Sequence, residues 1–367
     1  MYIEKINSPQ DIKDLSIDEL NILADEIRKG ILNRVSQHGG HVGPNLGFTE
    51  GTVALHYVFN APEDKIVFDI SHQSYPHKML TGRKDGFLDA SKMDGISGYS
   101  SPLENPEYDN FEIGHTSTSV SLISGMMKGR DILGGKENVI AVIGDGSLSG
   151  GEAFEGLDTV SEIGTNAIII VNDNEMSIAE VHGGLYRNLK ELRESDGQAS
   201  NNFFKAFGFD YLYVEDGNNV SKLVEAFRKV KDIDHPVVVH IHTEKGHGYL
   251  PAVENKERWH WSMPFNIEDG SLKSVNTGGE NMNMLLGNWL FDRLKKDPKM
   301  VLIASAVPAV LGLTAERRKA AGQQYIDVGI AEEEAVALAS GMAKRGAHPV
   351  YSTFATFLQR TYDRSEE

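Results

Sequence analysis

Short apolar runs recur along the chain and alternate with amphipathic stretches. Runs of this kind, rich in Val, Ile and aromatic residues and with the length of buried β-strands, occupy residues 65–70, 139–143, 167–171, 211–214 and 237–241. Between them, apolar residues at helical spacing indicate helices, as for Leu223, Phe227 and Val230. Strands that alternate with helices predict an α/β fold built on a doubly wound, mostly parallel sheet.

The first long helix has both a start signal and a stop signal. Ser16 and Glu19 form a capping-box pattern, and apolar residues between positions 20 and 35 keep helical spacing until Gly39 and Gly40 interrupt it. The next segment, residues 40–47, is rich in glycine and contains one proline and one histidine. We expect this segment to be a loop whose backbone can approach a ligand closely.

A polar stretch without periodicity, residues 266–280, predicts a linker between two domains. Helical patterns at 284–296 and 332–344 then alternate with strand patterns at 300–304, at 324–328 and near Val350. We therefore expect one domain at 1–265 and a second at 281–367. The second is short for an α/β domain, and we expect it to be incomplete.

Composition narrows the class of protein. The chain has 367 residues, a formal net charge of −17 and a pI near 5.2, which argue against binding to nucleic acids or anionic membranes. No cysteine is present, which excludes disulfides, thiolate nucleophiles and Cys-ligated metals. The first residues lack the apolar region of a signal peptide, and no apolar run approaches the ~20 residues of a membrane-spanning helix. We expect a cytoplasmic protein.

The unit from residue 144 to 176 carries the most informative chemistry. A Gly-Asp-Gly-Ser turn that includes Asp145 follows one predicted strand, and Asn174 follows the next. Parallel strands bring their carboxyl ends to one sheet edge, so Asp145 and Asn174 can converge. Two hard oxygen ligands beside a glycine turn that opens a helix suit a Mg²⁺ ion that holds a diphosphate. The alternative is an ordinary helix cap at Asp145 and a simple turn at Asn174.

Several histidines also lie in predicted loops at strand ends or helix starts, namely His41, His72, His115 and His260. Imidazoles suit proton transfer near neutral pH, although a lone histidine usually has a structural role. Gly114 and the hydroxyl residues after it precede a helix, which is a good arrangement for holding an anion.

The Gly-Asp-Gly turn followed by Asn at this distance resembles the metal–diphosphate motif of thiamine diphosphate (ThDP) enzymes. Over residues 15–363 the chain is similar to the transketolase-like 1-deoxy-D-xylulose-5-phosphate synthase family. Further matching segments begin at Lys245, Val328 and Phe354. The resemblance implies a diphosphate- and Mg²⁺-binding domain at 1–265 and a pyrimidine-binding domain at 281–367, and the family's sequence would continue beyond residue 367.

The resemblance also implies roles for individual residues. The Mg²⁺ ligands would be Asp145, Asn174 and the main-chain carbonyl of Met176. Contacts to ThDP would come from His72, Gly114, His115, Thr116, Gly146, Ser147, Asn174, Lys245, Tyr249, Glu332 and Phe357. Glu332 would be the catalytic carboxylate that faces the cofactor's aminopyrimidine ring. His41 and His260 would transfer protons to and from the substrate, and Arg360 would face the substrate.

The implied reaction joins pyruvate to D-glyceraldehyde 3-phosphate with loss of CO₂, and feeds the synthesis of isoprenoid precursors, thiamine and pyridoxal. The resemblance implies a homodimer. Four alternatives stay open at this point. The chain could be half of a split enzyme whose partner chain supplies the missing C-terminal part, an inactive ThDP-binding remnant, a transketolase-like enzyme with another acceptor, or an unrelated nucleotide-binding α/β protein.

Overall fold

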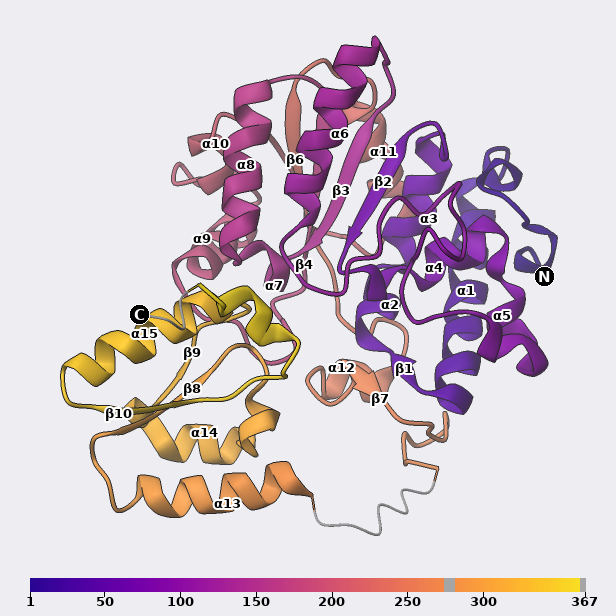
Figure 1. The fold of residues 1–367 in the computed structure, drawn as a ribbon. Helices are drawn as coiled ribbons and strands as arrows, with labels where there is room; N and C mark the ends of the chain where they lie inside the picture. Colours follow the sequence, from indigo (N-terminus) through magenta and orange to yellow (C-terminus); the bar gives the residue numbers. More distant parts are fainter. Residues whose placement is uncertain (274–280, 364–367) are drawn as a thin grey trace. The chain divides into compact units, whose positions relative to one another are not determined.

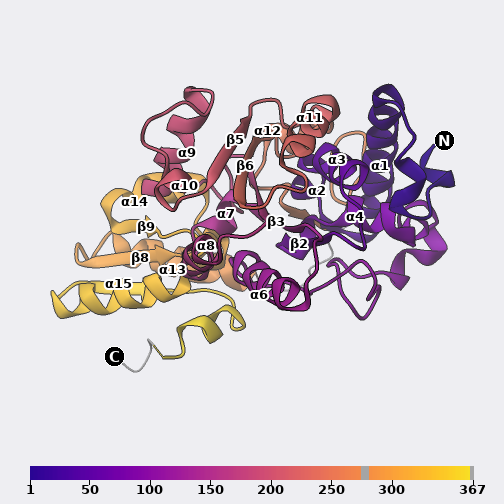
Figure 2. The ribbon, with the colours of Figure 1, turned by 90° about the horizontal axis from the view of Figure 1, so that it is seen from above.

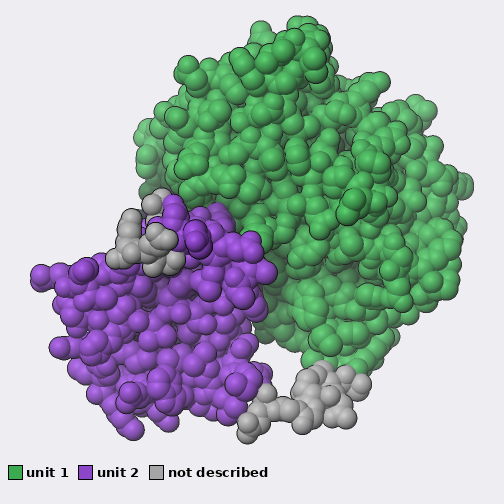
Figure 3. Space-filling model, in the orientation of Figure 1, with its two compact units in different colours: residues 1–176, 187–274 green, residues 177–186, 275–367 purple. Residues whose placement is uncertain are grey.

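The structure, a computed structural model, describes residues 1–273 and 281–363. Contacts divide the chain into two compact units, coloured separately in Figure 3. Unit 1 comprises residues 1–176 and 187–274, and unit 2 comprises residues 177–186 and 275–367. The domain bounds expected from the sequence stay a prediction.

Unit 1 is built on a five-stranded sheet in which every neighbouring pair is parallel. Its strands, in spatial order, are β2 (Lys65–Asp69), β3 (Val139–Gly144), β4 (Ala167–Asp173), β6 (Pro236–His242) and β5 (Asp210–Val214). The chain crosses over between strands through helices (Figure 1). The predicted α/β class and parallel sheet are therefore confirmed.

Both faces of this sheet are covered by helices. Helices α3 (Thr49–Val58) and α11 (Val220–Val230) lie on one face, and α6 (Ser119–Leu133) and α8 (Gly151–Ile163) lie on the other (Figures 1 and 2). Along β3, Ile140 and Val142 belong to the core that includes α3 and α11, and the alternate residues of the strand are equally buried. Burial on both faces explains why these strands are continuously apolar in the sequence.

Helix α1 (Ile17–His38) begins and ends where the sequence predicts. The Ser16 hydroxyl accepts a hydrogen bond from the Glu19 amide at 3.3 Å, and the Glu19 carboxylate accepts one from the Ser16 amide at 2.8 Å. Gly39 ends the helix with a φ of +82°, which an L residue rarely adopts.

Shorter elements complete unit 1. They are β1 (Gly40–His41), α2 (Gly43–Gly47), α4 (Tyr75–Lys78), α5 (Asp85–Leu88), α7 (Asp145–Leu148), α10 (Phe203–Ala206), α12 (Leu250–Glu254) and β7 (Trp261–Ser262), while α9 (Gly184–Glu194) begins among residues assigned to unit 2.

The expectation of a simple loop at residues 40–47 is wrong. The first two of these residues form β1, which pairs antiparallel with β7, and residues 43–47 form the short helix α2. Pro44 lies in the first turn of α2, a position that suits its fixed φ and missing N–H. The buried Asn45 amide anchors this helix to neighbouring backbone, a tertiary contact that local sequence does not reveal.

Part of the predicted linker can be described. Phe265 pairs with Leu272 in an isolated antiparallel bridge, and Phe265 is buried in the core of unit 1. Residues 266–273 therefore belong to unit 1, and the rest of the predicted linker lies outside the described residues.

Unit 2 contains a three-stranded parallel sheet in the order β10 (His348–Tyr351), β8 (Met300–Ala304), β9 (Tyr325–Asp327). Its helices are α13 (Met282–Leu294), α14 (Ala315–Ala321) and α15 (Glu332–Lys344). Leu290, Leu302 and Leu311 belong to its small core. The predicted helices and strands of this region are confirmed within one or two residues. Across both units, none of the described helices has the length and apolarity needed to cross a membrane.

Close packing of α6 against α8 supplies a test of the fold. A Cβ at Gly156 would lie 2.7 Å from the Ser121 amide nitrogen and 2.9 Å from the Val120 carbonyl carbon, both of which are backbone atoms. We expect Gly156→Ala to lower the free energy of unfolding by about 1–3 kcal/mol, because the helices must move apart. Urea denaturation monitored by circular dichroism measures this change.

The matched control is Gly125→Ala on α6, where a Cβ would meet no atom within 4 Å. This change should raise the free energy of unfolding by about 0.5–1 kcal/mol, because alanine loses less backbone entropy than glycine. Equal destabilisation by both variants would contradict the described α6–α8 contact.

Candidate functional site

The predicted metal ligands lie at the ends of neighbouring strands. Strands β3 and β4 are in parallel register, with Gly144 opposite Asn172, so Asp145 and Asn174 follow the strands at the same sheet edge (Figure 1). Asp145 is 1% exposed and Asn174 is 8% exposed. The Oδ2 atom of Asp145 and the Oδ1 atom of Asn174 are buried and have no hydrogen-bond partner among the described residues. Two oxygen acceptors therefore lack the donor or cation that burial requires.

Electrostatics distinguish Asp145 from its neighbour Asp173. Burial, followed by the negative charge of Asp173, raises the pKa of Asp145 well above its ordinary value. Burial alone would also raise the pKa of Asp173, but the hydrogen bond from His240 and the charge of Arg193 outweigh it and lower this pKa to about 2. Asp173 is thus an ionised carboxylate paired with the Arg193 guanidinium, whereas Asp145 lacks an adequate counter-charge.

A hydrogen-bonded chain holds Asp173 in place. His240 Nε2 donates to Asp173 Oδ2 at 2.8 Å, and the Tyr211 hydroxyl donates to His240 Nδ1 at 2.7 Å. Arg193 donates to the same carboxylate oxygen. Glu175, the residue after Asn174, has a positive φ of 64°, and its amide donates to Asp173 Oδ1 at 3.1 Å. The Asp173 carboxylate therefore shapes the turn that carries Asn174 and leads into Met176.

The 114–119 turn is attached to the same edge by a residue that the sequence analysis missed. The buried Asp69 carboxylate, at the end of β2, accepts hydrogen bonds from the amides of Ser117 at 3.1 Å and Ser119 at 3.0 Å. The Ser117 hydroxyl donates to the Ser147 carbonyl at 2.7 Å, and Ser117 has a φ of 78°. An acidic residue that ends an otherwise apolar strand was the available signal for this role.

Both glycine turns leave space beside the backbone. A Cβ at Gly114 or at Gly144 would meet no atom within 4 Å. Thr116 and Ser147 are buried next to these turns, and Gly146 donates its amide to Asp145 Oδ1 at 3.0 Å. Side chains larger than glycine at these turns would keep an anionic group away from the backbone. With glycine, such a group can approach the backbone closely, so the arrangement fits an anion.

Three of the four predicted histidines converge. The ring centres of His41 and His72 are 4.2 Å apart, and that of His260 lies 5.5 Å from His41 and 5.2 Å from His72. Burial lowers the pKa of His41 to about 4 and lowers the pKa values of His72 and His260 well below 6.5, with the nearby positive charge of Lys245 acting in the same direction. The cluster therefore consists of neutral imidazoles near neutral pH. The fourth, His115, lies in the 114–119 turn.

Lys245 and Tyr249 follow β6 in one loop. Lys245 is 1% exposed, and this burial lowers its pKa to about 7. Tyr249 lies in the core, with its ring edge-on to Trp259 at 5.2 Å, and its hydroxyl donates to the Ile267 carbonyl at 3.0 Å. Its predicted contact with ThDP stays a prediction.

The remaining predicted residues belong to unit 2. Glu332, 2% exposed, begins α15, and the Arg360 guanidinium donates to Glu332 at 3.5 Å and to Glu333 at 3.2 Å. The Phe357 ring is edge-on to the exposed Phe354 ring at 5.5 Å. Glu332 and Arg360 are thus brought together by the packing of α15 against residues 357–361.

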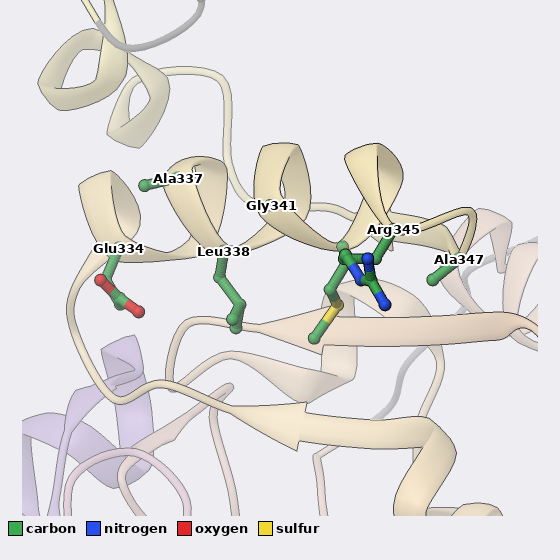
Figure 4. Close-up of a pocket in the computed structure, with 7 residues that line it drawn as sticks. Glu334, Ala337, Leu338, Gly341, Arg345 and Ala347 are labelled. Carbon is green, nitrogen blue, oxygen red and sulfur yellow. The ribbon is translucent and has the colours of Figure 1, made fainter.

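An open pocket of unit 2 is separate from these groups. It is lined by α15 and the turn after it, through Glu334, Ala337, Leu338, Gly341, Met342, Arg345 and Ala347 (Figure 4). None of the predicted site residues lines this pocket. Most of its lining side chains are apolar, and its two charged residues are Glu334 and Arg345.

Family models and known relatives match nearly the whole chain. The family model described as 1-deoxy-D-xylulose-5-phosphate synthase matches residues 3–200 and 195–243, and the model described as transketolase, pyrimidine binding domain, matches residues 280–365. A 1-deoxy-D-xylulose-5-phosphate synthase of Syntrophotalea carbinolica is 40% identical over 98% of this chain and 62% of its own length. One from Caldanaerobacter subterraneus is also 40% identical, over 99% of this chain and 63% of its length. The chain therefore spans less than two thirds of these relatives.

Solved structures show the fold alone. Transketolase from Campylobacter jejuni is 16% identical, with a TM-score of 0.56 over 95% of this chain and 67% of its own. Transketolase from Leishmania mexicana is 14% identical, with a TM-score of 0.51 over 95% and 66%.

The unequal environments of Asp145 and Asp173 give a test. Because the folded-state pKa of Asp145 is raised, its contribution to stability is fully present below its ordinary pKa of 3.8 and is lost as pH rises through the raised pKa. Without divalent metal, Asp145→Asn should remove this loss and raise the free energy of unfolding at pH 7 by roughly 1–3 kcal/mol. Denaturant titrations at several pH values in EDTA measure the effect.

Replacement of Asp173, at the end of the adjacent strand β4, by asparagine should change the free energy of unfolding in the opposite direction. The lowered pKa of Asp173 contributes stability above pH 3.8 that is lost as pH falls toward about 2. Asp173→Asn should therefore lower the free energy of unfolding at pH 7 by roughly 3 kcal/mol, since Arg193 and His240 lose a buried partner. Destabilisation of similar size by both variants would refute the described difference between the two carboxylates.

Proposed function

Because the chain belongs to the 1-deoxy-D-xylulose-5-phosphate synthase family, we propose that it is a ThDP- and Mg²⁺-dependent transferase. Its substrates are pyruvate and D-glyceraldehyde 3-phosphate, and its products are 1-deoxy-D-xylulose 5-phosphate and CO₂. The observation that carries the cofactor part of this proposal is the pair of buried, unpartnered oxygens on Asp145 and Asn174.

The donor set fits Mg²⁺. Magnesium takes hard oxygen ligands and usually keeps some water and substrate phosphate in its coordination shell. Asp145 Oδ2 and Asn174 Oδ1 would supply two such ligands, and the Met176 carbonyl would supply a third. The raised pKa of Asp145 shows that its negative charge is poorly compensated in the folded chain. A dication would provide the missing counter-charge.

The two glycine turns fit the diphosphate. Gly146 and Ser147 would lie against it, and the 114–116 segment, with His115, would approach from the neighbouring turn. The free space at Gly114 and Gly144 supports this assignment. Asp69 would act as a positioning residue, because its buried carboxylate holds the turn through the amides of Ser117 and Ser119.

When bound, ThDP supplies a centre that stabilises a carbanion equivalent. The chain's own residues would bind, orient and move protons around it. Glu332 would hold the aminopyrimidine ring through its buried carboxylate, Phe357 would stack on that ring, and Arg360 would bind the anionic substrate. His72, Lys245 and Tyr249 would lie toward the cofactor.

His41 and His260 would exchange protons with substrate oxygens. Their lowered pKa values leave each ring with one nitrogen that can accept a proton and one that can donate. A homodimer, a cytoplasmic location and a role in isoprenoid-precursor, thiamine and pyridoxal synthesis belong to the same proposal.

Turnover by the chain tests this function. The assay incubates it with ThDP, Mg²⁺, pyruvate and D-glyceraldehyde 3-phosphate, and follows release of CO₂ and formation of the five-carbon product. Glu332→Gln should lower kcat by about 10²-fold or more, because a carboxylate that takes part in proton transfer is lost.

Glu334→Gln is the control, because Glu334 lies in the same first turn of α15 but is exposed. Its kcat should stay within about twofold of the unmodified chain, as for most surface changes. Absence of turnover in the unmodified chain, or equal loss in both variants, would contradict the proposal.

A further inference from the structure

The cluster of His41, His72 and His260 has a geometry close to that of a metal site. One ring nitrogen from each residue can be chosen so that all three lie within 4.8 Å of one another. With metal–nitrogen distances of ~2.1 Å, two imidazoles on a tetrahedral zinc ion have ring centres about 5 Å apart. The separations of 5.5 and 5.2 Å to His260 match this value. The third pair, His41 and His72, is stacked at 4.2 Å with an angle of 23° between the ring planes, so one of these rings must turn and move outward by about 1 Å before both can bind one ion.

The backbones that carry the three rings are fixed before any ligand binds. The Asn45 amide donates to the carbonyls of both His41, at 3.0 Å, and His72, at 2.8 Å. The pairing of β1 with β7 fixes the backbone of His260, whose carbonyl accepts a hydrogen bond from the Val42 amide at 3.2 Å. Rigid support of this kind lowers the cost of bringing ligands together.

The ring nitrogens are also available. The Nδ1 atoms of His72 and His260 are buried and have no hydrogen-bond partner among the residues that the structure describes. An unpartnered nitrogen in such a setting costs free energy, and coordination would satisfy it. Neutral imidazole is the form that binds metals.

We propose that His41, His72 and His260 form a binding site for a zinc-class divalent ion, with a fourth position left to water. Nitrogen-only ligands favour zinc and its transition-metal neighbours over magnesium, which prefers oxygen. The site is therefore distinct in chemistry from the oxygen pair of Asp145 and Asn174. Zinc binding at this cluster goes beyond the proposed transferase function and does not depend on it, whereas the inferred inhibition by zinc rests on that function.

An ion at this cluster would compete with proton transfer by His41 and His260. It would occupy ring nitrogens that must otherwise accept or donate protons. The proposed consequence is inhibition by zinc at concentrations that leave Mg²⁺ binding unchanged. Lys245 opposes the ion, because its positive charge already acts on all three imidazoles.

Zinc binding to the full chain, free of metal and ThDP, tests the proposal directly. Titration against a chromophoric chelator should give one zinc ion per chain, and Co²⁺ should give the visible absorption of a tetrahedral site. His41→Asn, His72→Asn and His260→Asn should each weaken zinc binding by about tenfold or more, because each removes a ligand. His247→Asn is the control, since His247 is half-buried outside the cluster and paired with Glu244.

Two further variants separate this site from folding defects and from the Mg²⁺ site. Lys245→Met should tighten zinc binding by about threefold or more through loss of a repelling charge, which misfolding cannot mimic. Asp145→Asn should leave zinc affinity within about twofold, because it removes only a candidate Mg²⁺ ligand. Absence of stoichiometric zinc binding, or binding that persists when all three histidines are replaced, would overturn the proposal, whatever the outcome of the turnover assay.

Discussion

Burial of two carboxylates at the ends of adjacent parallel strands is the constraint on which the site depends. Asp145 and Asp173 lie at one sheet edge, where burial disfavours the charge on both. The chain satisfies Asp173 with Arg193 and His240, and this same carboxylate fixes the turn that carries Asn174. Asp145 is left with an unpartnered oxygen, and so is Asn174, which follows the adjacent strand at the same sheet edge. The cost of this arrangement to the folded chain is the observation on which the proposed divalent ion at this edge rests.

The parallel sheet makes this possible because it delivers strand ends, and therefore polar residues, to a common edge. Asp69 is a further polar residue at this edge. It ends β2, and its carboxylate holds the 114–119 turn by accepting hydrogen bonds from two backbone amides. The helices on both faces close the sheet to water along its length. Polar groups that lie beyond the last residue of each strand are therefore concentrated where the glycine turns leave open space.

Sequence patterns predicted the regular elements well, because continuous apolar strands and the capping box at Ser16 are local signals. They also placed Asp145 and Asn174 at one edge, since that inference needs only parallel strands. They could not show that His41, His72 and His260 converge, because this depends on the pairing of β1 with β7, about 220 residues apart, and on the amide of Asn45. For the same reason segment 40–47 was expected to be a loop, and Asp69 was missed.

The central claim is that Asp145 and Asn174 hold ThDP through a divalent ion. Titration calorimetry of the purified chain with ThDP, in Mg²⁺ and in EDTA, tests it most directly, with Asp145→Ala and Asn174→Ala as site variants and Asp210→Ala as an exposed control at the start of β5. The account predicts ThDP binding that requires Mg²⁺, is lost in both site variants and is retained in the control. ThDP binding of equal affinity in EDTA, or in Asp145→Ala, would contradict it.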